Sequence, residues 1–368
     1  MTDTALDPAA TAATIAGIAA DAVALAELDG GTGREQVRID WLQRRLAGAP
    51  GERRVDDAGN LVWTFGPPPY RLAVLAHVDD VFGPDTVREI TERDGWLAGP
   101  GIGDNAIAVA TTVAVVEHAL AEHALAEPDG PGLAPMAVVF TVAEEGLGGL
   151  RGARHACREL APEAVLALEG HGLDRVFTEA VGSLRVRLTV TGPGGHSWWD
   201  RGRPSALHEL VRLLDELIAS ASPRCPVNVG LADGGTGVNA IAARASAAVE
   251  WRSVEQAALD QRAAELTELK VAAGLELAVE RLDSRPAGSV PLDHPLVAAV
   301  RRARRSVGLP DATGDGSTDA NAALAADIPA LALGCSTGDN MHAPTERIRV
   351  ASIDTGARQL RAVIREVL

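Results

Sequence analysis

Apolar residues occur along the chain in two patterns, as short continuous runs and as longer stretches in which they recur every three or four positions. The continuous runs at 71–76, 135–142 and 164–168 have the length of buried strands. The stretches at 106–126 and 150–160 have helical spacing and lie between those runs. This alternation of strands and helices predicts an α/β fold with a central sheet flanked by helices.

The residues before this unit predict two helices and two strand-like runs. The helices span 8–28 and 34–46, and the glycine-rich residues 29–33 separate them. A turn at 57–60 interrupts the strand-like residues 54–62. The first helix lacks a basic start and contains Asp21, so we expect neither a signal peptide nor a membrane span there.

The pattern changes between residues 183 and about 283, where strands outnumber helices. The expected elements are strand 184–191, helix 205–221, strands 227–232 and 242–251, helix 255–273 and strand 276–281. Their order, βαββαβ, is typical of a small ferredoxin-like module. Helical and buried-strand patterns then resume at 294–307, 318–326, 328–333 and 352–368. We therefore predict a catalytic domain in two segments, 1–182 and 286–368, with a domain of residues 183–285 inserted between them.

Composition and charge narrow the classes of partner. The chain has 368 residues and a formal net charge of -16, and 46% of its residues are hydrophobic. A nucleic-acid surface needs a concentrated excess of Lys and Arg, so we expect no nucleic-acid partner and no membrane partner. Cys157, Cys225 and Cys335 are scattered and odd in number, which argues against a disulfide framework. A reducing compartment, the cytoplasm, is the expected location.

Polar side chains that can bind metal follow each predicted strand of the α/β unit, and a glycine-rich turn places another before helix 106–126. These residues are His77, Asp79, Asp104, Glu144, Glu145, Glu169 and His342. Ligands of open α/β sheets bind beyond the carboxyl ends of the strands. We therefore expect these side chains to converge at one edge of one sheet.

Converging carboxylates without a counter-ion repel one another and raise their own pKa values. Two divalent metal ions resolve this conflict, and Asp104, a carboxylate at a rigid turn, is suited to bridge them. We predict that His77 and Glu169 complete the ligands of one ion, and that Glu145 and His342 complete those of the other. Imidazole and carboxylate ligands suit Zn²⁺, and also Co²⁺ or Mn²⁺.

Three neighbouring residues lie outside the predicted ligand set. Asp79, two residues beyond His77 and on the same side of an extended chain, is predicted to orient the imidazole. Glu144 is predicted to be the general base that takes a proton from the attacking water. His171 lies close enough to Glu169 to support it, but we expect it in a solvent-exposed loop.

Six motifs in this order together resemble the M20 family of metallopeptidases, a family of co-catalytic zinc hydrolases. They are HVD, GPGIGDN, EEG, ALEG, GPGGHS and MHAPTE, and the resemblance covers essentially the whole chain. It implies a zinc-exopeptidase-like catalytic domain with a central mixed sheet, and an inserted lid that commonly forms a dimer. It also implies the metal roles given above, with Glu144 as the general base and Asp79 as the orienting carboxylate.

The resemblance further implies that the lid contributes substrate and oxyanion contacts. By motif these residues are His196 in GGHS, Asn239 in GGTGVNAI and Arg252 in EWRS. The histidine that matches His196 can reach the partner's active site in such enzymes, so a homodimer is expected. Trp198 and Trp199 follow this motif where the family often has small residues, and they either line a substrate pocket or pack within the lid.

Ser317 and Thr318 lie in a segment that resembles the family's residues near the substrate carboxylate. A helix start there suits an anion, but an ordinary N-cap explains both residues equally well. The predicted reaction is metal-dependent hydrolysis of an amide bond in a small peptide, by a dipeptidase or carboxypeptidase-like exopeptidase. An N-acyl amino acid deacylase is the alternative, and a non-catalytic binding protein with the same fold is a third interpretation.

Overall fold

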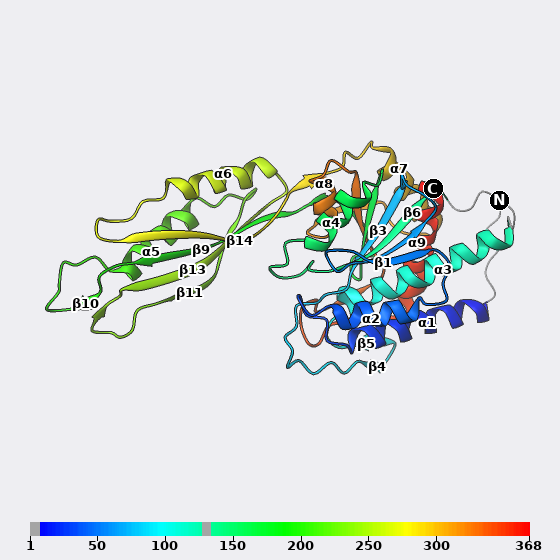
Figure 1. Ribbon diagram of the computed structural model, residues 1–368, viewed down its shortest axis with the longest axis horizontal. Coiled ribbons are helices and arrows are strands. Elements are labelled where there is room, and N and C mark those ends of the chain that lie inside the picture. The colour runs from blue at the N-terminus through cyan, green and yellow to red at the C-terminus, as the bar shows by residue number, and fades with distance from the viewer. Residues whose placement is uncertain (1–7, 127–133) are drawn as a thin grey trace. The chain divides into compact units, whose positions relative to one another are not determined.

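The computed structural model describes residues 8–126 and 134–368, which form two compact units (Figure 1). The first unit contains the residues up to Ala180 and Ser289–Leu368, and the second contains Val181–Gly288. Residues 1–7 and 127–133, which belong to the predicted segment 1–182, lie outside the described residues.

A mixed sheet forms the centre of the first unit, as predicted. Its strand order is β1-β2-β6-β3-β7-β17-β8-β15, and β16 pairs with β8. The bounds are β1 Glu52–Val55, β2 Leu61–Phe65, β3 Leu72–His77, β6 Met136–Thr141, β7 Val165–Glu169, β8 Arg175–Ala180, β15 Gly288–Ser289, β16 Ala312–Gly316 and β17 Ala330–Gly334.

Four neighbouring strands of this sheet are parallel. The central strand β3 pairs in parallel with β6 and β7, and β17 pairs in parallel with β7. In this register His77 lies opposite Thr141, and Gly334 lies opposite Glu169. The carboxyl ends of the four strands therefore meet at one edge of the sheet, where the predicted metal ligands follow them.

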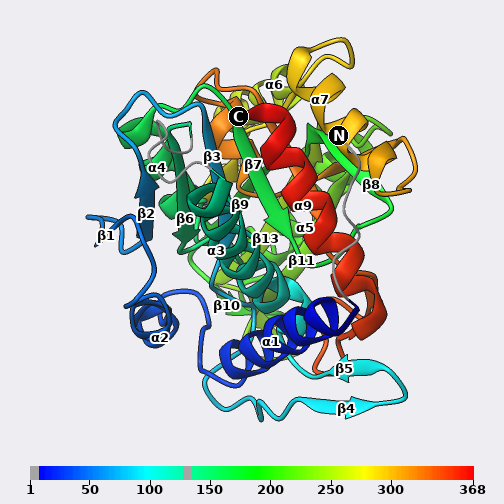
Figure 2. The same ribbon diagram turned by 90° about the vertical axis from the view of Figure 1, so that its right-hand side faces the viewer.

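Helices cover both faces of the sheet. Their bounds are α1 Pro8–Ala26, α2 Gln36–Arg45, α3 Ala108–Ala126, α4 Arg151–Leu160, α7 Pro295–Ser306, α8 Ala320–Leu324 and α9 Ile353–Val367. Figure 2 shows α1, α3 and α9 together on one face, and α4 and α8 pack on the other. Strand β3 is buried on both sides, with Leu72 and Val74 in one core and Ala73 and Leu75 in the other. Among the described residues, no helix combines the length and the apolarity that crossing a membrane requires.

A small four-stranded sheet, which the sequence analysis does not predict, joins two loops of the first unit. Its order is β18-β19-β5-β4, with β4 Thr91–Arg93, β5 Trp96–Ala98, β18 Gly338–Asp339 and β19 Arg347–Arg349. His342 lies between β18 and β19, and the turn that contains Asp104 follows β5. Pairing of β19 with β5 therefore brings these distant segments together.

Helix α3 begins two residues later than predicted, because Ile102–Ile107 forms an irregular turn before it. Asp104, at φ −108° and ψ 90°, and Asn105, at φ −133° and ψ 24°, are not helical. The amide side chain of Asn105 donates to the carbonyl oxygen of Leu168 at 2.9 Å, which ties this turn to the end of β7.

The second unit has the element order β9-α5-β11-β13-α6-β14, which is βαββαβ. The bounds are β9 Gly182–Thr191, α5 Ala206–Ala219, β11 Val227–Gly234, β13 Arg244–Ser253, α6 Gln256–Glu268 and β14 Glu276–Arg285, with the short pair β10 Gly195–His196 and β12 Ala240–Ile241. Both helices pack on the antiparallel sheet β11-β13-β9-β14.

The periodicity predicts that helix α6 continues to residue 273, but the helix ends at Glu268. Two side chains of α5 hold the following residues in another conformation. Arg212 donates to the carbonyl oxygen of Lys270 at 2.9 Å, and Glu209 accepts from the amide of Ala272 at 3.3 Å. Tertiary hydrogen bonds thus override the helical pattern there.

Candidate metal centre

The structure brings the five predicted metal ligands together at the carboxyl edge of the central sheet. His77 and Glu169 end β3 and β7, Glu145 follows β6, Asp104 lies in the turn before α3, and His342 lies between β18 and β19. Ligand atoms of His77, Asp104 and Glu145 all lie within 4.8 Å of one another. Residues that are far apart in the sequence therefore form one group of atoms that could hold a metal ion.

Asp104 lies between the two histidines and contacts each through a different oxygen. Its Oδ1 is 3.1 Å from Nε2 of His77, and its Oδ2 is 3.0 Å from Nε2 of His342. A carboxylate that faces two imidazoles in this way has the arrangement of a ligand that bridges two metal ions.

A second carboxylate accompanies each histidine. Oε2 of Glu169 is 3.6 Å from Nε2 of His77, and Oε1 of Glu145 is 3.3 Å from Nε2 of His342. These contacts form two imidazole and carboxylate sets that share Asp104, and the assignment of each set to one metal ion stays a prediction.

Hydrogen bonds in this cluster shift the pKa values of the histidines. Burial alone lowers the pKa of His77, but its contacts with Asp104, Asp79 and Glu169 raise that pKa well above its usual value. Contacts with Asp104 and Glu145 raise the pKa of His342 to about 10. In the protein without metal, His342 is therefore a charged imidazolium at neutral pH, and the contacts of His77 favour its charged form as well.

The pKa values of the three carboxylates shift in different directions, because two imidazoles cannot balance the charge of three carboxylates. Burial opposes ionisation of Asp104, yet hydrogen bonds with His342 and His77 hold the pKa of Asp104 below its usual range. Burial raises the pKa of Glu169 to about 7. Burial, and to a smaller extent the negative charge of Asp104, also raises the pKa of Glu145. Two imidazoles and three carboxylates, with no thiolate among them, fit divalent ions of the Zn²⁺ class, whose charge relieves this imbalance.

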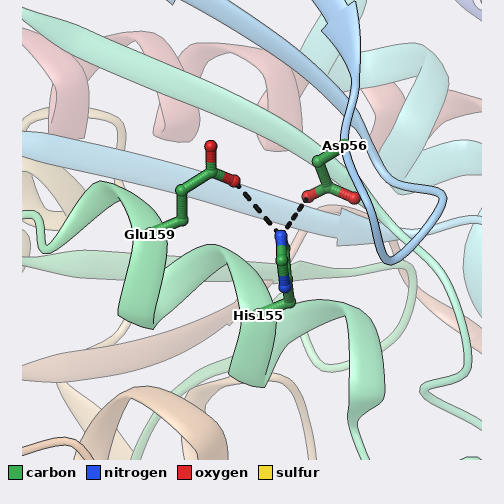
Figure 3. Close-up of side chains that lie close together, drawn as sticks. All are labelled: Asp56, His155 and Glu159. Carbon is green, nitrogen blue, oxygen red and sulfur yellow. Dashed lines mark ion pairs between the residues drawn. The ribbon is translucent and has the colours of Figure 1, made fainter.

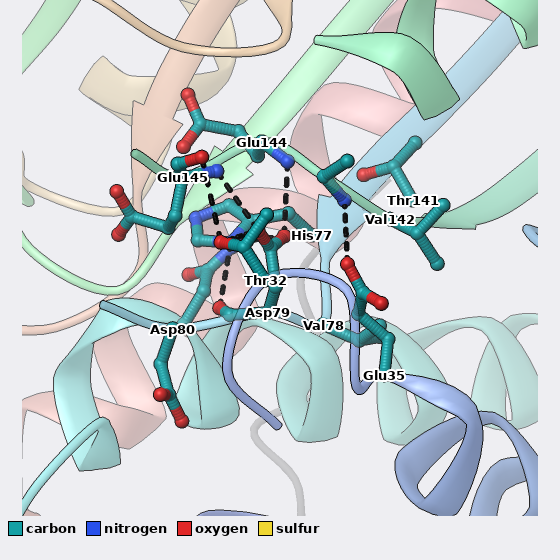
Figure 4. Close-up of polar contacts among 12 residues, drawn as sticks. Thr32, Glu35, His77, Val78, Asp79, Asp80, Thr141, Val142, Glu144 and Glu145 are labelled. Carbon is teal, nitrogen blue, oxygen red and sulfur yellow. Dashed lines mark hydrogen bonds and ion pairs between the residues drawn. The ribbon is translucent and has the colours of Figure 1, made fainter. Parts of the chain in front are cut away.

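Asp79 is fully buried, and its oxygen atoms accept hydrogen bonds from several groups near the predicted metal ligands (Figure 4). Nδ1 of His77 lies 3.1 Å from the backbone carbonyl oxygen of Asp79 and 3.6 Å from its carboxylate. The carboxylate instead accepts the amide protons of Glu144 at 3.0 Å and Glu145 at 2.9 Å. Asp79 therefore contacts the imidazole mainly through its backbone and fixes the turn after β6 through its side chain.

Glu144, the predicted general base, lies in that turn between Ala143 and the predicted ligand Glu145. Only 4% of its surface is exposed. Ala143 adopts φ 58°, in the left-handed region, which turns the chain sharply after β6. The turn places Glu144 beside a predicted ligand at the same edge of the sheet.

Glu346 is a supporting residue that the sequence analysis does not identify, and its partner is His171, which the sequence analysis considers only as a neighbour of Glu169. Oε1 of Glu346, which is fully buried, accepts the amide proton of Asp104 at 3.0 Å and lies 2.6 Å from Nε2 of His171. The expected solvent-exposed position of His171 is wrong, because only 11% of its side chain is exposed. The motif MHAPTE contains Glu346, but only the fold shows that this carboxylate reaches the turn of Asp104.

His196, Asn239 and Arg252, the predicted substrate residues, all lie in the second unit. His196 pairs with Ala240 in the β10 and β12 ladder, and the carbonyl oxygen of Asn239 accepts the amide proton of Ser197 at 2.9 Å. The structure therefore brings the GGHS and GVNAI motifs together. Arg252, at the end of β13, forms an ion pair with Glu250 at 3.1 Å.

Trp198 and Trp199 are 63% and 77% exposed, so packing within the described chain does not account for them. The guanidinium carbon of Arg201 lies 5.1 Å from the centre of the Trp198 ring. Nδ1 of His196 accepts the amide protons of Trp198 and Trp199 at 3.1 and 3.3 Å. The loop therefore presents two indole rings next to the imidazole.

Ser317 and Thr318 lie between β16 and α8. The hydroxyl of Thr318 accepts the amide proton of Ala320 at 3.1 Å, and the amide of Thr318 donates to the side chain of Asn321 at 2.8 Å. These bonds are typical of local capping at a helix start. The next residue, Asp319, is buried and accepts a hydrogen bond from Thr141 at the end of β6.

Asp56, His155 and Glu159 form a second group of close metal-binding atoms (Figure 3). Nε2 of His155 is 3.3 Å from Glu159 and 3.8 Å from Asp56. The carboxylate of Asp56 already accepts hydrogen bonds from the amides of Ala58 and Asn60 and from the Asn60 side chain, and Glu159 pairs with Arg54. These contacts account for the group without a metal ion.

Comparison with known proteins gives one family and consistent relatives. Residues 73–366 match the family described as Peptidase family M20/M25/M40. A LysW-lysine hydrolase of Deinococcus radiodurans is 28% identical over 347 residues, which cover 90% of this chain and 92% of that protein. An acetylornithine deacetylase of Myxococcus xanthus is 31% identical over 247 residues, or 59% of this chain and 61% of that protein. The crystal structure of a tripeptidase from Staphylococcus aureus has the same fold, with a TM-score of 0.79 at 20% identity, and the match covers 96% of this chain and 98% of that one.

Proposed function

The chain belongs to peptidase family M20/M25/M40, and from this premise we propose that it is a dinuclear metal-dependent exopeptidase. Its relatives are hydrolases, so it is an enzyme, and its reaction is hydrolysis of an amide bond in a small substrate. The proposal concerns the number of metal ions, the residues that act and the kind of amide.

The contacts of Asp104 are the observation that carries this proposal. One carboxylate faces His77 through Oδ1 and His342 through Oδ2, at 3.1 and 3.0 Å. Glu169 and Glu145 complete two sets around that carboxylate. One metal ion would leave part of these two sets without a role, whereas two ions that share Asp104 would account for all five side chains.

We assign one ion to His77, Asp104 and Glu169, and the other to Asp104, Glu145 and His342. Zn²⁺ is the proposed metal, and Co²⁺ or Mn²⁺ suits the same ligands. Bound ions supply Lewis acidity, which polarises the scissile carbonyl and lowers the pKa of water.

Glu144 is the proposed general base. Its carboxylate takes a proton from the attacking water and delivers that proton to the nitrogen of the leaving amine, which balances the hydrolysis. Asp79 maintains the position of Glu144 by accepting a hydrogen bond of 3.0 Å from the backbone amide of Glu144. His196 is proposed to donate to the oxyanion, and Asn239 and Arg252 to contact the substrate. Ser317 and Thr318 are proposed near the substrate carboxylate, although the Thr318 hydroxyl already accepts a backbone proton.

The preferred substrate is a short peptide, cut by a dipeptidase or carboxypeptidase-like reaction. The relatives named LysW-lysine hydrolase and acetylornithine deacetylase specifically favour the alternative, in which the amide lies between an acyl group and an amino acid. The two substrate classes differ in whether the cleaved molecule has a free amino terminus.

We also propose that the enzyme is a cytoplasmic homodimer that associates through the second unit. The three cysteines are buried and unpaired, which suits a reducing compartment. Analytical ultracentrifugation tests the dimer, because a mass of about twice 38.1 kDa supports it and a mass of 38.1 kDa contradicts it.

The test of the proposed function compares the parent protein with Glu144→Gln. Both proteins are stripped with a chelator, loaded with Zn²⁺, Co²⁺ or Mn²⁺, and assayed on dipeptides and on N-acetyl and N-succinyl amino acids. We expect the parent to hydrolyse one of these classes. We expect Glu144→Gln to lose about 10²- to 10⁴-fold in turnover at unchanged metal content, because it lacks only the proton acceptor. Near-normal rates in Glu144→Gln would show that the assigned role is wrong.

A further inference from the structure

The loop between α1 and α2 contacts the turn that contains the proposed general base (Figure 4). In the sequence this loop is a glycine-rich separator between two helices. It also lies outside residues 73–366, to which the family match is confined. Two of its side chains, Thr32 and Glu35, nevertheless reach the residues around Glu144.

Thr32 contacts one end of the turn and the carboxylate that accepts two amide protons of the turn. Its hydroxyl donates to Oδ2 of Asp79 at 2.8 Å and lies 3.4 Å from the carbonyl oxygen of Glu145. The same carboxylate of Asp79 accepts the amide protons of Glu144 and Glu145. The Thr32 hydroxyl therefore fixes the acceptor that holds both amides of the turn.

Glu35 holds the residue on the other side of Glu144. Its Oε1 accepts the amide protons of Ala143 at 3.1 Å and of Gly33 at 2.9 Å. Glu35 is buried, with 5% of its surface exposed, so water does not replace this acceptor readily. Three successive amides, from Ala143 to Glu145, thus end on carboxylates that lie outside the turn.

The loop is itself attached to the backbone that follows β3. The amide of Asp80 donates to Gly30 at 2.9 Å, and the amide of Thr32 donates to Asp80 at 3.2 Å. The close approach requires glycine, because a Cβ at Gly30 would lie 2.1 Å from Nε of Arg38, and a Cβ at Gly31 would lie 2.6 Å from the carbonyl oxygen of Phe82. Segment 30–35 is therefore attached through its backbone to the segment that follows His77.

We propose that Thr32 and Glu35 are positioning residues for the hydrolysis. They act through the Ala143–Glu145 turn and set the place of the Glu144 carboxylate relative to the metal ligands. This inference rests on the proposed function, since Glu144 is the base only if the centre hydrolyses amides. A displacement of about 1 Å at a reacting group can cost 10²-fold in rate, so the loss of one of these bonds affects turnover more than binding.

Matched variants test the proposal. Thr32→Val removes the hydroxyl at nearly constant shape, whereas Thr32→Ser retains it. Glu35→Leu removes the acceptor, whereas Glu35→Gln retains an oxygen for the two amides. Thr112→Val is the control, because the buried hydroxyl of Thr112 donates to Ala108 at 2.8 Å within α3.

The kinetic measurement uses the dipeptide or N-acyl amino acid that the parent protein cleaves fastest. We expect kcat to fall by about 10- to 100-fold in Thr32→Val and Glu35→Leu, with KM and metal content within about twofold of the parent. Thr32→Ser, Glu35→Gln and Thr112→Val are expected to retain at least about half of the parent kcat. Equal losses of kcat in Thr32→Val and Thr112→Val would overturn the proposal.

Two further measurements separate positioning from general destabilisation. In a Glu144→Gln background, Thr32→Val is expected to cause no further loss of kcat, because it acts through the group that is already removed. Additive losses would contradict this. Hydrogen exchange of residues 142–146 is expected to accelerate in Thr32→Val and to match the parent in Thr32→Ser.

Hydrogen exchange also separates the two hypotheses, because it needs no substrate. If the parent hydrolyses nothing in the panel, the proposed function fails, and the exchange rates still decide whether Thr32 fixes the turn. Unchanged exchange in both Thr32→Val and Glu35→Leu overturns the inference even when the parent is an active hydrolase.

Discussion

The ionisation of single residues explains why the centre suits metal ions. In the protein without metal, carboxylates raise the pKa of His342 to about 10 and hold the pKa of His77 well above its usual value. Protons on these imidazoles occupy the nitrogen atoms that face Asp104. A metal ion that binds there must displace them, because only neutral imidazole is a ligand.

Metal binding is therefore expected to release protons at pH 7, and metal affinity is expected to increase with pH. The sign follows from the raised pKa values, since a lower pH keeps His77 and His342 protonated. Titration calorimetry of the chelated protein with Zn²⁺, in buffers with different ionisation enthalpies, measures the number of protons released. Release of no protons would contradict the assignment of both histidines as ligands.

The same pKa shift predicts the pH dependence of the metal-free protein. His342 has a folded-state pKa of about 10, above its ordinary value of 6.5. Its ion pairs therefore stabilise the fold fully below pH 6.5, and this contribution is lost as the pH rises through about 10. Glu169, whose pKa burial raises from 4.5 to about 7, changes the stability in the same direction, because the fold favours its protonated form and this contribution is lost as the pH rises from 4.5 through about 7.

At the scale of elements, long strands and helices follow from the sequence, and strands of two or three residues do not. Strands β3, β6 and β7 are uninterrupted apolar runs, so their pattern alone predicts them. Strands β18 and β5 have two and three residues, and pairing defines them, of β18 with β19 and of β5 with β19 and β4. This small sheet holds the loop of His342 next to the turn of Asp104. Because the sequence does not predict the sheet, it also does not explain why these two residues meet.

Glu346 provides an element-scale test, because it ends that loop and accepts the amide proton of Asp104 at 3.0 Å. Glu346→Leu is expected to weaken metal binding by about 10- to 100-fold, since it frees the turn that carries Asp104, the proposed bridging ligand. His155→Ala is the control, and it is expected to leave metal affinity unchanged because Asp56 and Glu159 have other partners. Competition with a fluorescent zinc chelator measures both affinities. An effect of His155→Ala equal to that of Glu346→Leu would contradict this assignment.

At the scale of the whole molecule, the family, the fold class and the hydrolytic function that the sequence predicts are confirmed. The five ligand positions could be predicted because each follows a recognisable strand or glycine turn. Thr32, Glu35 and Glu346 could not, since their partners lie 47, 108 and 242 positions away in the chain. The roles of the ligands, of Glu144 and of the second unit stay predictions.

The central claim is tested most directly by the number of metal ions that the chain retains with and without the Asp104 carboxylate. The parent protein and Asp104→Ala are chelated, reloaded with Zn²⁺, dialysed and analysed for metal by mass spectrometry. If Asp104 bridges two ions, the parent retains about two ions per chain, and Asp104→Ala retains fewer than one because both sets lose a shared ligand. A parent protein with one ion or none, or an Asp104→Ala variant that still holds two, would contradict the account.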